Sequence, residues 1–126
     1  MKKYHAWLDI SVGGIVSQPM QRILCNDLAN KLSGKIIFEL GEDVEFKNYN
    51  LQLRNMIKNK LDVNGFIFLR LEQFSNKKKL NKELILEILK NNYELHFIRQ
   101  NLSLFNISDF KKNLNDLVIF DNIIKT

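Results

Sequence analysis

The sequence is poor in residues that cross-link or interrupt a chain, with one cysteine, Cys25, and one proline, Pro19, among 126 residues. A single cysteine cannot form a disulfide within the chain. This fits a reducing cytosol, and its expected place on a buried helix indicates a packing role. No apolar stretch approaches the roughly 20 residues that span a bilayer. His5 and Asp9 also interrupt the segment that would have to serve as a signal-peptide core. We therefore expect a cytoplasmic protein with no membrane partner.

Neither sign of charge dominates strongly, since nineteen basic residues against fourteen acidic ones give a formal net charge of +5. This excess would suit a polyanionic partner. However, most of it is lysine scattered over expected helix surfaces. The one dense cluster, residues 77–79, has no aromatic side chains interleaved for stacking on bases. Nucleic acid is therefore not the partner we expect. Arginine is scarce and is found only as Arg22, Arg54, Arg70 and Arg99.

The fold signal is strongest in residues 63–72, an apolar run with charge at its downstream end. The run does not alternate between apolar and polar residues, is too short for a buried helix, and is rich in Phe and Ile. This pattern is typical of a strand buried on both faces of a parallel sheet. The charged residues Arg70 and Glu72 then lie at the carboxyl end of the strand, where open α/β sheets bind ligands.

Strands and helices alternate four times along the chain, which at this length indicates a single domain spanning residues 1–126. Strands are expected over residues 4–11, 35–40, 63–72 and 93–98. Helices are expected from Pro19 to about residue 32, over 49–62, from about 80 to 91, and in the C-terminal region. This succession predicts an α/β fold with three α/β/α layers and a four-stranded parallel sheet in the flavodoxin-like order 2-1-3-4.

The C-terminal region, residues 107–126, is expected to form a helix capped by Ser108 or Asp109, followed by an apolar tail. Residues 118–124 are more apolar than a solvated tail should be. The tail either packs on the body of the domain or meets another subunit, which would make the protein a homo-oligomer.

Polar residues gather where the expected strands end, and these form the predicted site. Acid–base catalysis is assigned to His96 with Glu39 or Glu72. A phosphate loop is assigned to Gly13 and Gly14, whose backbone N–H groups precede a helix. Substrate binding is assigned to the remaining set: Ser11, Gln18, Gln21, Arg22, Arg70, Arg99 and Gln100.

Each assignment has a structural alternative. His96 could be a hydrogen-bonded core histidine, and the glutamates could simply pair with Arg70 or Arg99. Ser11 has no specified base beside it, and the glycine pair matches neither a Walker A loop nor the GxGxxG spacing. No His, Cys and Asp cluster has metal-ligand spacing, so we predict neither a structural metal nor a cofactor.

Several of these segments resemble the sporadic carbohydrate cluster protein family, which is encoded among bacterial surface-polysaccharide genes. Members open the first helix with Pro-Gln-x-x-Gln-Asn, where residues 17–22 read Ser-Gln-Pro-Met-Gln-Arg, and Asp27 matches an acidic residue further along. Their glutamate after the second strand matches Glu39. Residues 64–72 match their Asp-Gly-Ile-type strand and polar turn. Residues 95–97 match their Leu-His-Phe.

This resemblance extends from about residue 15 to 104 and implies a role in surface-glycan sugar biosynthesis, without a defined reaction. The departures are Ser17 for the proline, Arg22 for the asparagine, Gln100 for an acid, and residues 69–70 for a Tyr-Ser pair.

The order of elements also resembles the serine recombinase (resolvase) catalytic domain, in which a serine ends the first strand as Ser11 does here. That family needs an arginine where Asp9 stands, and a Leu-Asp-Arg-Leu-x-Arg motif where residues 71–76 read Leu-Glu-Gln-Phe-Ser-Asn. We also expect no helix-turn-helix module after this domain. The resemblance therefore implies a resolvase-like fold without recombinase chemistry.

Three functions remain open. The first, which is the function we predict, is an enzyme of bacterial surface-carbohydrate (capsule or lipopolysaccharide) biosynthesis that acts on a phosphorylated or nucleotide-linked sugar by proton transfer, as an isomerase, epimerase or lyase. The second is a non-catalytic module that binds a sugar nucleotide or a partner protein. The third is a degenerate nucleic-acid domain with a resolvase-like fold.

Overall fold

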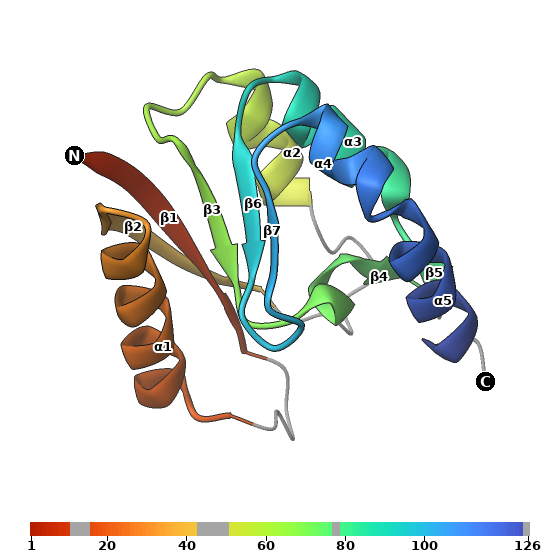
Figure 1. Cartoon of the computed structure of the whole chain (residues 1–126). Coiled ribbons are helices and arrows are strands. Elements are labelled where there is room, and N and C mark those ends of the chain that lie inside the picture. Colours follow the sequence, from red (N-terminus) through yellow and green to blue (C-terminus); the bar gives the residue numbers. More distant parts are fainter. Residues whose placement is uncertain (11–15, 43–50, 77–78, 125–126) are drawn as a thin grey trace.

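A computed structural model describes residues 1–10, 16–42, 51–76 and 79–124 (Figure 1). In chain order, the elements are β1 (Lys2–Asp9), α1 (Gln18–Lys31), β2 (Gly34–Glu42), α2 (Leu51–Lys58), β3 (Gly65–Phe68), the 3₁₀ helix η1 (Leu71–Phe74), β4 (Ser75–Asn76), β5 (Lys79–Leu80), α3 (Lys82–Lys90), β6 (Glu94–Phe97), β7 (Leu102–Leu104), α4 (Ile107–Lys112) and α5 (Leu114–Ile124). None of these helices is long and apolar enough to cross a membrane.

The main sheet has five strands in the order β2-β1-β3-β6-β7. The first four run parallel, and β7 pairs antiparallel with β6. The prediction of an α/β fold is confirmed, but the predicted four-stranded, all-parallel sheet is wrong, because β7 adds a fifth, antiparallel strand and extends the strand order beyond β6. The short strands β4 and β5 form a separate two-stranded antiparallel sheet.

The unpredicted strand β7 depends on a tight turn after β6. Asn101 lies in the turn with φ at 49°, and its N–H donates to the carbonyl of Ile98 at 3.0 Å. Asparagine is one of the few residues that tolerate this left-handed conformation. The turn reverses the chain, so that three residues can add to the sheet edge. A strand this short has too few residues for a periodic signal.

The sheet is apolar on both faces, and helices cover each one (Figure 1). On one face, Tyr4, Ala6 and Leu8 of β1 pack against Cys25 and Ala29 of α1. On the other face, the core joins the remaining large side chains of the strands to α2, α3, α4 and α5; it includes Trp7, Phe66, Phe68, Leu95, Phe97, Leu53, Ile57, Leu84, Ile88, Phe110 and Leu117. Successive strand residues point to opposite faces, so a strand with helices on both sides needs the unbroken apolar run seen in residues 66–69.

The first helix begins and ends close to the predicted positions. The Ser17 hydroxyl accepts a hydrogen bond from the N–H of Met20 at 3.4 Å, and proline occupies the first turn. Gly34 does not end the helix but begins β2, and Ser33 before it adopts the left-handed conformation with φ at 61°. Gly34 is required for close packing, because a Cβ there would lie 2.6 Å from a ring carbon of Tyr4.

Two other boundaries differ from the predictions. The strand expected over 63–72 is shorter, and its charged end forms the start of η1, with Arg70 at the N-cap. The C-terminal region forms two helices, and Asn106, rather than Ser108 or Asp109, caps the first one. Within α5, Leu117 is buried while Ile119 is 56% exposed, so this helix packs on the body of the domain with one face only. The homo-oligomer expected through this segment stays a prediction.

Candidate functional site

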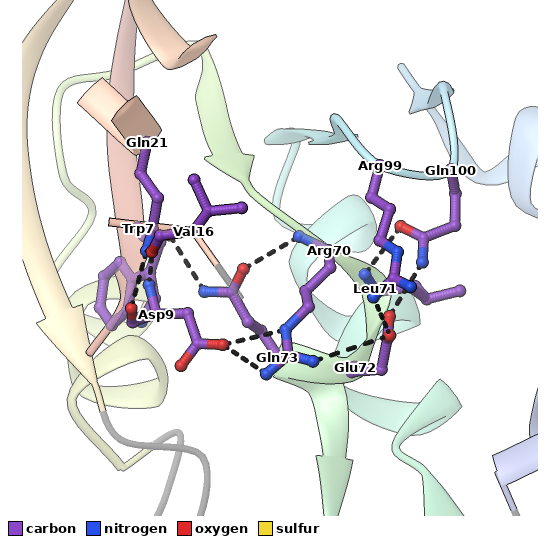
Figure 2. Close-up of polar contacts among 10 residues, drawn as sticks. All are labelled: Trp7, Asp9, Val16, Gln21, Arg70, Leu71, Glu72, Gln73, Arg99 and Gln100. Carbon is purple, nitrogen blue, oxygen red and sulfur yellow. Dashed lines mark hydrogen bonds and ion pairs between the residues drawn. The ribbon is translucent and has the colours of Figure 1, made fainter. Parts of the chain in front are cut away.

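A buried ion pair joins the carboxyl ends of the two central strands. Asp9 ends β1, and Arg70 follows β3 by two residues. The guanidinium donates from Nε and Nη2 to Oδ2 of Asp9, at 2.9 and 2.5 Å (Figure 2). The side chains of Arg70 and Asp9 are only 17% and 2% exposed. A carboxylate so far from water requires an opposite charge, and Arg70 supplies it.

Two buried glutamines form hydrogen bonds with the backbone next to this ion pair. Gln21 of α1 accepts from the N–H of Asp9 and donates to the carbonyls of Asp9 and Val16, each at 2.9 Å. Gln73 of η1 accepts from the N–H of Arg70 at 3.0 Å and donates to the carbonyl of Trp7 at 3.0 Å. Both side chains thus satisfy backbone groups where the strands end. Gln21, predicted to bind substrate, has this positioning role.

Glu72 connects the ion pair to the residues that follow β6. Arg99 Nη1 donates to Glu72 Oε2 at 3.1 Å, and Arg70 Nη1 lies 3.8 Å from the same oxygen. Gln100 donates to Glu72 Oε1 at 2.9 Å and accepts from the N–H of Leu71 at 2.9 Å. We call the whole set the carboxyl-edge network: Asp9, Gln21, Arg70, Glu72, Gln73, Arg99 and Gln100 (Figure 2). Its two carboxylates balance its two guanidinium groups.

Glu39 and Arg22 pair with each other outside this network, at 2.7 Å between Nε and Oε1. The expectation that Glu39 ends its strand is wrong, because β2 continues to Glu42 and Glu39 lies opposite Ala6 in the sheet. Gln18 is the exposed first residue of α1. Ser11, Gly13 and Gly14 lie outside the described residues.

His96 belongs to a second group of polar residues. Its Nε2 lies 2.9 Å from Oε1 of Glu94, and its Nδ1 lies 2.8 Å from the hydroxyl of Ser103. Tyr4 donates to Glu94 Oε1 at 2.8 Å, and Lys2 donates to its Oε2 at 3.1 Å. We call Lys2, Tyr4, Glu94, His96 and Ser103 the histidine cluster.

The expected pairing of His96 with Glu39 or Glu72 is therefore not what the structure shows. Both ring nitrogens are engaged within the histidine cluster, and the side chain is fully buried. The two glutamates have arginine partners instead. The predicted site is thus divided: Arg70, Glu72, Arg99 and Gln100 come together, while His96 lies apart from them.

The histidine cluster changes the acidity of its members. Burial raises the pKa of the Glu94 carboxyl, but hydrogen bonds from His96, Tyr4 and Lys2 outweigh burial, so its pKa lies below the usual value. Burial and the hydrogen bond to Glu94 raise the pKa of the Tyr4 phenol. Glu94 is therefore held as a carboxylate and Tyr4 as a neutral donor.

Sequence reasoning missed Lys2, Tyr4, Gln73, Glu94 and Ser103 as members of these groups. A signal existed for Glu94, because residues two apart on a strand share a face, as Glu94 and His96 do. Gln73 and Ser103 carried no comparable signal, since their roles depend on η1 and β7. Within the described residues, no group of three or more His, Cys, Asp or Glu side chains could hold a metal ion.

No protein family matches the sequence, and no curated protein matches it. The resemblance to the sporadic carbohydrate cluster family thus has no support from these comparisons. The fold does match a solved structure, the N-terminal catalytic domain of TP901-1 integrase, with a TM-score of 0.60 and 16% sequence identity over 98% of this chain and 92% of that chain. The chain has the fold of a serine recombinase catalytic domain. At this identity, the match concerns the fold alone.

Proposed function

We propose that this chain acts in bacterial surface-carbohydrate biosynthesis, and that the carboxyl edge of its sheet is a non-catalytic site that binds a phosphorylated or nucleotide-linked sugar. The observation that carries the proposal is the meeting of two guanidinium groups, from Arg70 and Arg99, at one oxygen of Glu72. Paired arginines of this kind suit the geometry of a phosphate. Their position beyond the central parallel strands is where open α/β sheets bind ligands.

The two arginines have different parts in this proposal. Arg70 is held by the buried Asp9 carboxylate and supplies a fixed positive charge. Arg99 is 53% exposed. Its described bond to Glu72 uses one of the five N–H donors that a guanidinium carries, so the group can engage a phosphate with the others. Glu72 and Gln100 are hydrogen-bonded to each other. In the proposed complex, the same side-chain groups form hydrogen bonds with sugar hydroxyl groups instead.

The position of His96 favours binding over proton transfer at the carboxyl edge, because His96 lies apart from Arg70 and Arg99. Its ring is fully buried, and both its nitrogens are engaged in the histidine cluster. An isomerase, epimerase or lyase at the carboxyl edge would need another acid–base pair. Glu72 has partners on both carboxylate oxygens, Arg99 on one and Gln100 on the other.

Thermal unfolding with a panel of sugar 1-phosphates and uridine diphosphate sugars tests the proposal. We expect at least one member to raise the Tm of the wild-type protein, as any ligand of the folded state does. The Arg99→Met variant should lose this rise, because the phosphate loses its exposed cation. The Lys90→Met variant is the matched control, since it removes an exposed cation from α3, and should keep the rise.

Mass spectrometry of the same mixtures separates the alternatives. Unchanged sugars support a binding module, whereas a new product would favour the proton-transfer enzyme. An equal rise in Tm for wild type and Arg99→Met would contradict the assigned site. Binding to a DNA duplex that weakens steeply with salt, with no response to any sugar, would favour the nucleic-acid alternative.

A further inference from the structure

The histidine cluster contains three side chains in a linear hydrogen-bonded order: a hydroxyl, an imidazole and a carboxylate. Ser103 Oγ lies 2.8 Å from Nδ1 of His96, and Nε2 of the same ring lies 2.9 Å from Oε1 of Glu94. Both distances lie within the range required between a nucleophile, its base and the group that orients the base. The proposed function above leaves all three residues unused.

Sheet geometry fixes this arrangement. Glu94 and His96 share a face of β6, and Ser103 lies directly opposite His96 on β7. The backbone N–H groups of Glu94 and Ile98 donate to carbonyls on the β3 side, at 2.9 and 3.0 Å. His96 lies two residues from each of them along the strand, so its backbone N–H and C=O groups also face β3. His96 and Ser103 therefore form a non-hydrogen-bonded antiparallel pair, the kind that brings side chains closest together.

The carboxylate sets which ring nitrogen carries the proton. Glu94 accepts hydrogen bonds from Tyr4 and Lys2 as well as from the histidine ring, which keeps it ionised. An ionised carboxylate needs a donor, so the proton of a neutral imidazole lies on Nε2. Nδ1 is then an acceptor that faces the Ser103 hydroxyl.

A cavity of about 270 Å³ opens beside the hydroxyl. Ser103, which is half-buried, lines it together with Leu24, Asp27, Leu28 and Lys31 of α1 and with residues 97, 98, 101 and 102, which lie in and beside the turn between β6 and β7. The ring of His96 is flanked edge-on by Tyr4 and Phe105, with centroids 5.6 and 5.1 Å away. The base is thus shielded from water, while the hydroxyl borders a pocket of mixed polarity, in which Leu24 and Leu28 suit an acyl group and the ion pair of Asp27 and Lys31 also contributes to the lining.

We propose that Ser103, His96 and Glu94 form a nucleophilic site that hydrolyses small acyl esters, with the acyl group held in this cavity. Ser103 Oγ forms a bond to the acyl carbon as its proton passes to His96 Nδ1. The bond from the acyl carbon to the ester oxygen then breaks, and that oxygen takes the proton from Nδ1 and leaves as an alcohol. Water reverses these steps: it gives a proton to Nδ1, attacks the acyl carbon and releases a carboxylic acid, while the proton returns to Ser103.

A donor for the negative charge that develops on the acyl oxygen is also present. Because Ser103 belongs to a non-hydrogen-bonded pair, its backbone N–H points away from β6, and β7 is the last strand of the main sheet. The N–H of the nucleophile itself is a common oxyanion donor in serine hydrolases. The site does not depend on ligand binding at the carboxyl edge.

Two probes test this site: hydrolysis of p-nitrophenyl acetate, and covalent labelling by diisopropyl fluorophosphate with peptide mapping. The wild-type protein should release p-nitrophenol and gain one label on Ser103. The Ser103→Ala variant should lose both. Ser108→Ala, which removes an exposed hydroxyl from α4, should keep both.

The Glu94→Gln variant separates catalysis from folding, because it replaces a side chain that is 12% exposed by one of nearly the same shape. Its labelling rate should fall by about 100-fold or more while its far-UV circular dichroism stays unchanged, since the base loses the group that orients it. A label on Ser11 or any other residue, no label at all, or equal hydrolysis by Ser103→Ala would overturn the proposal.

Discussion

The carboxyl-edge network and the histidine cluster both hold a carboxylate among donors, but they are assembled over different distances in the sequence. The ion pair of Asp9 and Arg70 joins residues 61 positions apart. His96 meets Glu94 and Ser103 at separations of two and seven residues. The network therefore forms only because β1 and β3 are neighbours in the sheet. The contacts of His96 with Glu94 and Ser103 require only β6, β7 and the turn between them.

The two regions also differ in how they meet solvent. In the network, the solvent exposure of the side chains increases from the buried Asp9 to Arg99, which is half exposed at the rim. In the cluster, the histidine is fully buried and the charged lysine at its margin is 42% exposed. This contrast leads us to assign ligand binding to the first region and chemistry to the second. It also predicts that the buried end of the network contributes most to stability.

The largest effect is expected for Arg70→Ala, which leaves the Asp9 carboxylate buried without its arginine. We expect the free energy of unfolding to fall by about 3–5 kcal/mol, the usual cost of removing one partner from a buried ion pair. Urea denaturation measures it, with Arg99→Ala as a control that should cost no more than about 1 kcal/mol. Equal losses for the two variants would remove the distinction between the buried and exposed ends of the network.

A smaller loss is expected for Gln73→Ala. This change removes the amide that satisfies the Arg70 N–H and the Trp7 carbonyl, and the cost should be about 1–3 kcal/mol. Gln52→Ala, at an exposed position on α2, is the matched control. If both variants unfold at the wild-type urea concentration, Gln73 does not fasten the strand ends as we describe.

The smallest effect is a change in pH dependence for Glu94→Gln. The folded pKa of Glu94 lies below its usual value of 4.5, so the unfolded chain takes up this proton first as the pH falls. The stabilisation is complete above pH 4.5 and is lost as the pH falls through the folded pKa. Urea midpoints measured from pH 7 to 3 should therefore fall less steeply below pH 4.5 in the variant.

His5 supplies an internal reference for this measurement. Burial lowers its pKa from the usual 6.5, so below pH 6.5 the imidazole binds a proton more readily in the unfolded chain than in the folded one. The resulting loss of stability begins at higher pH than that of Glu94 and is common to both proteins. Parallel curves for wild type and Glu94→Gln below pH 4.5 would show that the carboxylate is not specially stabilised in the cluster.

The strands that are buried on both faces of the sheet could be predicted from the sequence. Residues 66–68 are apolar at every position because Phe66 and Phe68 face one helical layer and Ile67 faces the other. Helix α1 could also be predicted, because the signals for its start, the capping serine and the proline, are local to its first turn. Strand β7 could not be predicted, since three residues carry no period and a turn at Asn101 places them.

For the candidate site, the sequence determined which polar residues follow the strands, and four of them, Arg70, Glu72, Arg99 and Gln100, do come together. Only the tertiary structure decided their partners. His96 was expected beside Glu39 or Glu72, but a side chain at the middle of a strand reaches its own face of the sheet and the strand alongside. Periodic patterns report which residues are buried, whereas pairing between strands distant in sequence decides which buried groups meet.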